Sequence, residues 1–385
     1  MLTEQEIKRG TLAAKISINA QLLSGEAGYR RAGIHQYISQ VLRHLPQQNN
    51  LDYLVYTRHD GNFLHKANIT AVATTIPTEK RSLRILWEQL IWPWQSWRQQ
   101  VALLHSMAFV TPLFAAQPAI ITVYDLSFMH YPEQFPTLQR QYLTSQTRRS
   151  CQQAKRIITI SESSKRDIHQ FFNTPLDQID VVYPGVDSIY QPLPRQEIES
   201  FRQEKGIDRF ILHVGTLQPR KNIATLLEAF AQLEAPDLDL VLVGGKGWLF
   251  ADIFAKVQAL NLENRVHFTG YVPDEELPLW YNAADLLLFP SFYEGFGMPI
   301  IEAMACGTPV VAANNSSIPE AVGNAGQLFA PRNVQECVDR ITAVLHNPQL
   351  SAKMRALGLE HARQFSWDRA GLETAAVYQR ALREE

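Results

Sequence analysis

The sequence predicts an α/β protein with two parallel-sheet domains. Short apolar, β-branched runs alternate with amphipathic segments, and runs such as Leu286–Phe289 are apolar at successive residues. Such strands are covered on both faces, and their alternation with helices favours parallel sheets with right-handed crossovers. The chain has 385 residues, more than the usual size of one hydrophobic core.

Eleven strands follow from these runs. In the first half they are Lys15–Ala20, Leu51–Thr57, Val101–His105, Ala119–Tyr124, Arg156–Ser161 and Ile179–Tyr183. In the second half they are Phe210–Gly215, Leu238–Gly244, Val266–Gly270, Leu286–Pro290 and Pro309–Ala312. Helical patterns between them include Gly33–Leu45, Ile223–Leu233 and Pro299–Ala305.

The strand and helix pattern runs twice, which predicts a first domain over 1–190 and a second over 191–365. We expect the linker at Tyr190–Ile207, because two prolines and the charged stretch Arg195–Lys205 interrupt the apolar runs there. In open α/β folds a ligand binds at the carboxyl ends of strands, so we expect it between the two sheets.

Composition excludes several classes of protein. The formal net charge of −2 gives no global field that favours nucleic acid. The three cysteines, Cys151, Cys306 and Cys337, are far apart and lack the C-x-x-C spacing of a zinc site. The amino terminus has no apolar core of signal-peptide length, and the longest apolar stretch, Leu83–Trp97, is broken by polar residues and proline. We therefore expect a cytoplasmic protein.

The most informative segment is Phe289–Glu302, in which two glutamates, Glu294 and Glu302, lie eight residues apart. It predicts the end of a buried strand, a glycine-bearing loop and a helix that opens at Met298. The backbone N–H groups of a helix start suit an anion, and the two carboxylates suit hydroxyl groups. An activated sugar, with a phosphate ester between a polyol and a ribose, matches that combination.

Three other loops are candidates for phosphate binding. Gly215 precedes Arg220 and Lys221, which lie just before a predicted helix and suit a diphosphate, although such a pair can also be a solvated cap. The loop that contains Gly245 lacks the Lys-Ser/Thr of a Walker A motif, and a tight turn explains it equally well. Gly33 opens the first helix, after Arg30 and Arg31.

These segments together resemble the retaining glycosyltransferases of group 1, or family 4, which have the GT-B fold of two Rossmann-like domains facing across a cleft. The resemblance rests on Val214–Asn222, Leu242–Gly247, Gly270–Glu275 and, above all, Ala284–Val311. It covers most of the chain from Lys15 onward. It implies an acceptor-binding first domain, a donor-binding second domain, and a final helix over 366–385 that returns to the first domain.

The resemblance also implies roles for single residues. Glu294 would contact the donor sugar, Glu302 the ribose, and Arg220 with Lys221 the diphosphate. Further donor contacts would come from the backbone or side chains of Gly33, Gly215, Gly245, Tyr271, Val272, Gly295, Phe296, Gly297 and Met298. Many relatives have Gly-Arg where this chain has Gly215-Thr216, so Arg220 would supply the first cation.

A second departure concerns the first domain. Many relatives have a histidine near the reacting sugar where this chain has Tyr124. A phenol is a poor base at neutral pH, so Asp125 becomes the best-placed carboxylate of this domain, with His130 as another candidate. Both Tyr124 and Asp125 can equally belong to a turn at a strand end. We expect His105, His213 and His267 to be satisfied core or strand-end histidines.

The resemblance implies a retaining hexosyltransferase without a metal or other cofactor. GDP-mannose is the leading donor and UDP-glucose or another UDP-sugar the alternative; the acceptor is an oligosaccharide, free or lipid-linked. A nucleotide-dependent oxidoreductase would need Gly-x-Gly-x-x-Gly after the first strand, which is missing. A non-catalytic, two-lobed sugar-binding protein stays open as an alternative, although we find no export signal.

Residues 81–98 carry four of the seven tryptophans together with arginines. Trp and Arg on an amphipathic helix are typical of peripheral contact with a membrane interface. The alternative is a helix packed on the first sheet, with Trp as core or as a wall of the acceptor site.

Overall fold

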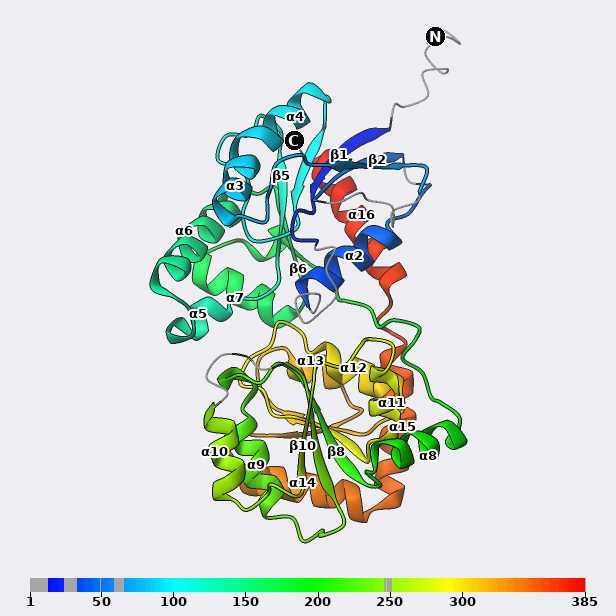
Figure 1. Ribbon diagram of the computed structural model, residues 1–385. Helices are drawn as coiled ribbons and strands as arrows, with labels where there is room; N and C mark the ends of the chain where they lie inside the picture. The colour runs from blue at the N-terminus through cyan, green and yellow to red at the C-terminus, as the bar shows by residue number, and fades with distance from the viewer. Residues whose placement is uncertain are drawn as a thin grey trace. The chain divides into compact units, whose positions relative to one another are not determined.

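The computed structural model describes residues 13–23, 33–48, 50–58, 66–245, 247 and 251–384. The chain divides into two compact units, of which unit 1 comprises 1–183 with 367–385 and unit 2 comprises 184–366. Each unit is a parallel sheet flanked by helices (Figure 1). These are two Rossmann-like α/β domains, and the predicted fold class is confirmed. No helix within the described residues is both long and apolar enough to cross a membrane.

Unit 1 contains seven strands within the described residues, in the order β3-β2-β1-β4-β5-β6-β7, and every pair is parallel. The order reverses between β1 and β4. The strands are β1 Ala14–Asn19, β2 Leu51–Thr57, β3 Ile69–Ala73, β4 Leu103–Ser106, β5 Ala119–Val123, β6 Arg156–Thr159 and β7 Ile179–Val181. The helices are α2 Ile34–His44, α3 Arg81–Leu86, α4 Trp92–Arg98, α5 Ser127–His130, α6 Thr137–Gln153, α7 Glu162–Phe172 and α16 Trp367–Arg383.

Unit 2 has six strands in the described part of the chain, in the order β10-β9-β8-β11-β12-β13, again all parallel. The order reverses between β8 and β11. The strands are β8 Phe210–Val214, β9 Asp239–Val243, β10 Val266–Gly270, β11 Leu286–Phe289, β12 Val310–Ala313 and β13 Gln327–Phe329. The helices are α8 Arg195–Lys205, α9 Ile223–Ala231, α10 Ala251–Ala259, α11 Leu277–Ala283, α12 Met298–Ala305, α13 Ile318–Val322, α14 Val334–His346 and α15 Pro348–Ala362.

The predicted strands are all present, but the sequence missed β3 and β13. Both are short strands at a sheet edge, where one partner strand suffices and little apolar surface marks them. Several predicted strands also end one or two residues early in the structure. The residues after β5, β8 and β11, among them Tyr124, Gly215 and Pro290, leave the ladder and begin loops.

The predicted linker Tyr190–Ile207 is wrong, because most of it is a helix of unit 2. The charged stretch Arg195–Lys205 forms α8, and Gly206 ends that helix in a left-handed conformation. Phe201 of α8 is buried edge-on against Trp280 of α11, with ring centroids 5.0 Å apart. One apolar residue among many charged ones therefore fixes α8 to the unit, a signal that the charge pattern hid. The boundary falls at 183/184.

The final helix α16 belongs to unit 1, as the resemblance implied. It packs on α2. The hydroxyl group of Tyr378 forms a hydrogen bond of 2.7 Å with Nδ1 of buried His105 on β4. Gly371 is the point of closest approach. A methyl group there would lie 2.1 Å from the carbonyl oxygen of His44, the last residue of α2.

We expect Gly371→Ala to destabilise the protein. Alanine favours a helix by about 1 kcal/mol over glycine, but the clash with the His44 backbone forces α16 away from α2. Overpacking of this kind costs about 1–3 kcal/mol, which urea denaturation would measure.

Gly358→Ala in α15 is the matched control, since a methyl group there would have the flexible side chain of Met304 as its nearest neighbour, at 3.2 Å, and no backbone atom nearer than 3.6 Å. Equal effects of the two substitutions would contradict the proposed importance of the α2–α16 contact.

Candidate donor-binding site

Two loops of unit 2 meet where the strand order of its sheet reverses. One follows β8 and the other follows β11, and these two strands are paired neighbours, with Leu286 opposite Ile211. The backbone N–H of Phe292 in the second loop donates to the carbonyl oxygen of Arg220 in the first, at 2.9 Å. The carboxyl ends of strands at such a reversal are the usual binding place of open α/β sheets.

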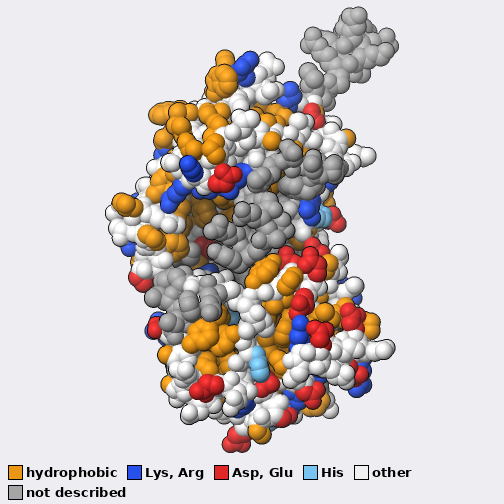
Figure 2. Space-filling view, in the orientation of Figure 1, with side chains coloured by type: hydrophobic (Ala, Val, Ile, Leu, Met, Phe, Trp, Pro, Cys, Tyr) orange, Lys and Arg blue, Asp and Glu red, His pale blue; other side chains and the backbone are white. Residues whose placement is uncertain are grey.

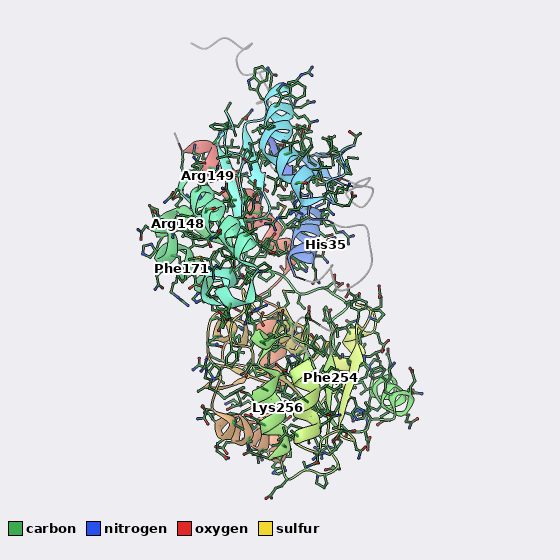
Figure 3. All side chains as sticks on the ribbon, turned by 60° about the vertical axis from the view of Figure 1, so that its left-hand side comes forward. His35, Arg148, Arg149, Phe171, Phe254 and Lys256 are labelled. Atoms are coloured by element: carbon green, nitrogen blue, oxygen red, sulfur yellow. The ribbon has the colours of Figure 1, made fainter. Side chains whose placement is uncertain are left out.

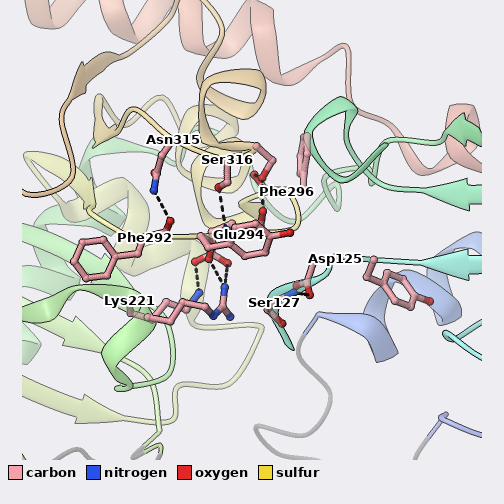
Figure 4. A network of polar contacts seen from close by, with 12 residues as sticks. Asp125, Ser127, Lys221, Phe292, Glu294, Phe296, Asn315 and Ser316 are labelled. Carbon is pink, nitrogen blue, oxygen red and sulfur yellow. Dashed lines mark hydrogen bonds and ion pairs between the residues drawn. The ribbon is translucent and has the colours of Figure 1, made fainter. Parts of the chain in front are cut away.

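Glu294 joins the two loops through its carboxylate. Oε1 accepts from Nζ of Lys221 at 2.7 Å, and Oε2 accepts from Nη1 of Arg220 at 3.1 Å (Figure 4). Arg220 also donates to the carbonyl oxygen of Tyr293. The structure therefore brings together the three residues that the sequence singled out, as one ion cluster.

The charge state of Glu294 follows from this pairing. Burial alone raises the pKa of the carboxyl group, but Lys221 and Arg220 outweigh burial and lower the pKa to about 2. Glu294 is only 8% exposed, so it is a buried carboxylate that depends on two cations. Glu294 is therefore not a loop glutamate exposed to water.

Polar side chains that the sequence analysis missed hold both loops. The amide nitrogen of Asn222 donates to the carbonyl oxygens of Pro290 and Pro331, at 3.0 and 2.7 Å. The N–H of Glu294 donates to Oγ of Ser316 at 3.0 Å, and Oγ of Ser317 donates to the carbonyl oxygen of Glu294 at 2.8 Å. No local pattern marks the two serines, since only the fold brings them to Glu294.

The glycine-bearing loop after β9 packs against the loop after β8. A methyl group at Gly244 would lie 2.1 Å from the carbonyl oxygen of Gly215, and one at Gly247 would lie 2.5 Å from that of Leu217. The N–H of Leu217 donates to the carbonyl oxygen of Gly245 at 3.0 Å. Close packing of two backbones thus explains Gly244 and Gly247, and ligand contact by Gly215 and Gly245 stays a prediction.

The start of α12 lies directly after Glu294. Gly297 precedes the helix with φ at 109°, a conformation that favours glycine. Gly295 and Phe296 are buried, Phe296 packs on Phe365 at 5.3 Å, and Met298 is half-buried. These four residues carry the backbone N–H groups predicted to face an anion.

Glu302 lies one turn into α12 and is 5% exposed. The hydroxyl group of buried Tyr281 donates to its Oε2 at 2.7 Å. Burial raises the pKa of Glu302 to about 7; the Tyr281 hydrogen bond opposes that rise, and the charges of Asp274 and Asp187 add to it. Glu302 is therefore not a glutamate on the exposed surface of the helix. Tyr281 has no counterpart in the sequence predictions.

Tyr271 and Val272 follow β10 on the same edge of this sheet. Tyr271 is 46% exposed, whereas Val272 is buried. Asp274, two residues further on, is one of the acidic groups that act on Glu302. The predicted contact of this loop with a nucleotide base stays a prediction.

The predicted residues of unit 1 have partners of their own. The hydroxyl group of buried Tyr124 donates to the carbonyl oxygen of Met107 at 2.7 Å, and burial raises its pKa well above the usual value. Asp125 accepts the N–H of Ser127 at 2.9 Å and so caps the turn before α5. Gly33 lies at the start of α2, while Arg30 and Arg31 fall outside the described residues. Catalytic roles for Tyr124 and Asp125 remain predictions.

The four histidines differ in how they are satisfied. His105 bonds to Tyr378 and Thr122 through its two nitrogens, as expected of a core histidine. His267 pairs with Asp239 at 3.2 Å, and His130 pairs with Asp167 at 3.0 Å. His213 is only half satisfied. Its Nδ1 bonds to the carbonyl oxygen of Leu288, but its buried Nε2 has no hydrogen-bond partner in the described part of the chain.

Within the described residues, no group of three or more His, Cys, Asp or Glu side chains is placed to hold a metal ion. That the transfer reaction needs no metal ion stays a prediction.

Two protein families match this chain. Residues 195–360 match the family described as "Glycosyl transferases group 1", and residues 31–188 match "Glycosyltransferase Family 4". Each match falls largely within one of the two structural units.

Named relatives agree with the family matches. The chain is 36% identical to O-antigen chain mannosyltransferase B of Escherichia coli over 265 residues, which is 68% of this chain and 70% of that protein. It is 32% identical to D-inositol 3-phosphate glycosyltransferase of Corynebacterium glutamicum, over 63% of this chain and 62% of that protein.

Solved structures share the fold at lower identity. Anabaena HepE in complex with UDP matches with a TM-score of 0.73 at 22% identity, over 95% of this chain and all of that one. Sucrose-phosphate synthase of Thermosynechococcus elongatus matches with a TM-score of 0.76 at 24% identity, over 95% and 98% of the two chains. The protein has the GT-B fold, and it belongs to the group 1, family 4 glycosyltransferases.

We expect Glu302 to make stability depend on pH. Its pKa is raised from 4.5 to about 7 in the folded protein, so between these values the folded state binds more protons than the unfolded state. The stabilisation that the Glu302 carboxyl group contributes is therefore complete below pH 4.5 and decreases as the pH rises toward 7. A shift of this size is worth roughly 3 kcal/mol.

Glu302→Gln removes this titration. The difference in unfolding free energy between the variant and the wild type should grow in favour of the variant across that window. Tyr281→Phe keeps the titrating carboxyl group and serves as the control. A difference that does not change with pH would show that Glu302 titrates normally.

Proposed function

We propose that this glycosyltransferase is a retaining hexosyltransferase that moves mannose from GDP-mannose to an oligosaccharide or lipid-linked acceptor in polysaccharide synthesis. The observation that carries the proposal is the buried cluster of Glu294, Arg220 and Lys221 beside the start of α12. Two cations and a helix start suit a diphosphate, and the carboxylates suit the sugars on either side.

In this proposal the cations exchange partners when the donor binds. Arg220 and Lys221 turn from Glu294 to the diphosphate, whose charge grows as it leaves, and Glu294 then accepts from sugar hydroxyl groups. Glu302 accepts from the ribose beside Tyr281. The unliganded ion cluster keeps both cations at the site, so little reorganisation is needed; loss of one such donor typically costs roughly 3–4 kcal/mol.

We expect same-face attack, in which an oxygen of the departing phosphate takes the proton of the acceptor hydroxyl. No protein nucleophile and no metal is needed in that mechanism, so the two-carboxylate logic of glycoside hydrolases does not apply to Glu294 and Glu302. In unit 1, Asp125 is the carboxylate proposed to act on the acceptor. Tyr124, whose hydroxyl group is bonded to Met107, is proposed to support the neighbouring strand end.

The donor is proposed from the relatives. Two of them are named mannosyltransferases, from Escherichia coli and Mycolicibacterium hassiacum. HepE is described with UDP and with UDP-glucose, and UDP-glucose therefore remains the alternative donor. We place the reaction in the cytoplasm, since the three cysteines are buried and unpaired, as in a reducing compartment.

A non-catalytic sugar-binding protein would share the two-unit architecture. Incubation with candidate nucleotide sugars separates the two functions, because only an enzyme releases nucleoside diphosphate.

We predict that Lys221→Ala and Glu302→Ala each abolish the thermal stabilisation by nucleotide sugars. A ligand at a hundred times its dissociation constant stabilises by about 2.7 kcal/mol, enough for a thermal-shift screen of GDP- and UDP-sugars. Lys256→Ala is the matched control, because Lys256, labelled in Figure 3, also pairs with a glutamate, Glu228, and the two residues lie on α10 and α9 rather than on the two loops. An undiminished thermal shift in both variants would contradict the assignment of Lys221 and Glu302 to a donor-binding site.

The tryptophan-rich segment supports a second proposal, peripheral contact with a membrane. Trp87 and Trp92 are buried and stacked, with centroids 6.2 Å apart, so part of the segment is core. The side chains at positions 86, 90, 94 and 97 share one helix face and are 50–61% exposed. They are Leu86, Leu90, Trp94 and Trp97, and we call them the apolar stripe. Figure 2 shows hydrophobic side chains gathered over this part of unit 1.

Charge favours an anionic lipid surface as the partner of the stripe. The segment 79–98 carries Lys80, Arg81, Arg84 and Arg98 against Glu79 and Glu88, although the whole chain is acidic by two charges. The guanidinium of Arg98 lies 5.1 Å from the ring centre of Trp94, at the end of the stripe. Exposed Trp with flanking cations is suited to the bilayer interface.

We predict that replacing Trp94 and Trp97 together with Gln weakens binding to vesicles that contain phosphatidylglycerol, measured by co-sedimentation. Loss of buried apolar area on this scale should lower the partition at least about tenfold. Leu372→Gln, at an equally exposed site on α16, is the control. Self-association that disappears in the double variant would instead identify the stripe as a contact between copies of the chain.

A further inference from the structure

Unit 1 contains a group of arginines that no part of the proposed donor site uses. Arg58 follows β2, Arg84 lies on α3 and Arg149 lies on α6. Electrostatic interactions connect them with Glu88 and Tyr142, and we call these five residues the arginine cluster. Figure 3 labels Arg149 on α6 beside its neighbour Arg148.

Short contacts and electrostatics connect the cluster. Nε of Arg84 lies 3.8 Å from Glu88, which also accepts from the amide of Asn19, the last residue of β1, at 3.3 Å. Burial lowers the pKa of Arg58, and the charge of Arg84 lowers it further. Burial raises the pKa of Tyr142; Glu88 adds to the rise, whereas Arg84 and Arg149 oppose it.

Several N–H donors of this region are buried and have no hydrogen-bond partner among the described residues. They are Nε of Arg58, Nε and Nη1 of Arg149, and Nε2 of Gln21. Gln21 belongs to the same network, because its backbone N–H donates to Asn19 at 3.1 Å. A buried donor without a partner is destabilising, because it has lost its hydrogen bond to water. All four atoms are donors, so a partner that binds here must supply acceptor atoms, as a phosphate does with several oxygens.

The charges of the region point to an anion. Arg58, Arg84 and Arg149 are joined by Arg81, whose guanidinium lies 5.1 Å from the ring centre of Tyr142. Against these four cations stand Glu79 and the largely buried Glu88. Guanidinium forks match phosphate oxygens in geometry and charge. Asn19 ends β1 and Gln21 follows it, and β1 is one of the two strands between which the order of the sheet reverses.

We propose that the arginine cluster binds a phosphate or diphosphate ester, and that this group belongs to the acceptor. The identification with the acceptor rests on the proposed glycosyl transfer. It favours a lipid-linked acceptor over a free oligosaccharide. The apolar stripe continues the α3 segment that carries Arg84, so a lipid tail and its phosphate both find suitable side chains on one helical segment.

The test is calorimetric titration with inorganic pyrophosphate. It uses the full chain with Lys221→Ala, which weakens the proposed diphosphate site of unit 2. We expect binding that Arg149→Gln and Arg58→Gln each weaken at least about tenfold. Arg148→Gln is the matched control on α6, because Arg148 is exposed and lies over Phe172, 5.7 Å from its ring centre. Unchanged unfolding midpoints would exclude misfolding.

Absence of pyrophosphate binding, or equal binding by the Arg148 and Arg149 variants, would overturn the proposal. Co-sedimentation with vesicles containing phosphatidic acid distinguishes a phosphate that the arginine cluster binds from a lipid phosphate that only the apolar stripe brings to the surface. Binding that depends on Trp94 and Trp97 but not on Arg149 would also overturn it, since the phosphate would then be met by the surface alone.

The proposed function and the anion site of unit 1 can be tested separately. Thermal stabilisation by nucleotide sugars, measured in Arg149→Gln with Lys221 intact, should equal that of the wild type. If no nucleotide sugar stabilises any variant while pyrophosphate binding still depends on Arg149, the glycosyl transfer is wrong and the anion site remains.

Discussion

The pairing of one buried carboxylate with two cations is the interaction on which the donor site depends. Glu294 is almost fully enclosed, and without Lys221 and Arg220 its charge would be costly to bury. Its partners come from a loop more than seventy residues earlier in the chain, which reaches it because β8 and β11 are neighbouring strands. The ion cluster therefore ties the two loops together and holds the cations where a diphosphate would need them.

The two glutamates of one motif are in opposite electrostatic states. Glu294 has a pKa lowered to about 2 by its cations, whereas Glu302, eight residues on, has a pKa raised to about 7 by burial near other acids. The first can give up its cations to a more strongly charged ligand, and the second is suited to neutral hydroxyl groups. This division agrees with a donor that has a charged centre between two sugars.

Unit 1 has a different chemistry at the ends of its strands. It offers arginine N–H groups that lack a partner among the described residues, a tryptophan-rich segment that is half core and half surface, and two glutamates, Glu79 and Glu88, beside the cations of the arginine cluster. The two units share one architecture, but their side chains suit different ligands, as expected when function depends on sites rather than on the fold.

Local residue patterns were enough to predict the class of fold, most strands and the family, and they singled out the three charged residues that the structure brings together at the candidate donor site. Apolar runs and a long ordered motif are local signals, and they can be recognised without knowledge of the fold. Only the tertiary structure decided that α8 belongs to unit 2, through Phe201 on Trp280, that Tyr281 bonds to Glu302, and that Ser316 and Ser317 hold Glu294. It also decided which tryptophans are buried and which arginines cluster. Such pairings join residues far apart in the chain, and no local pattern records them.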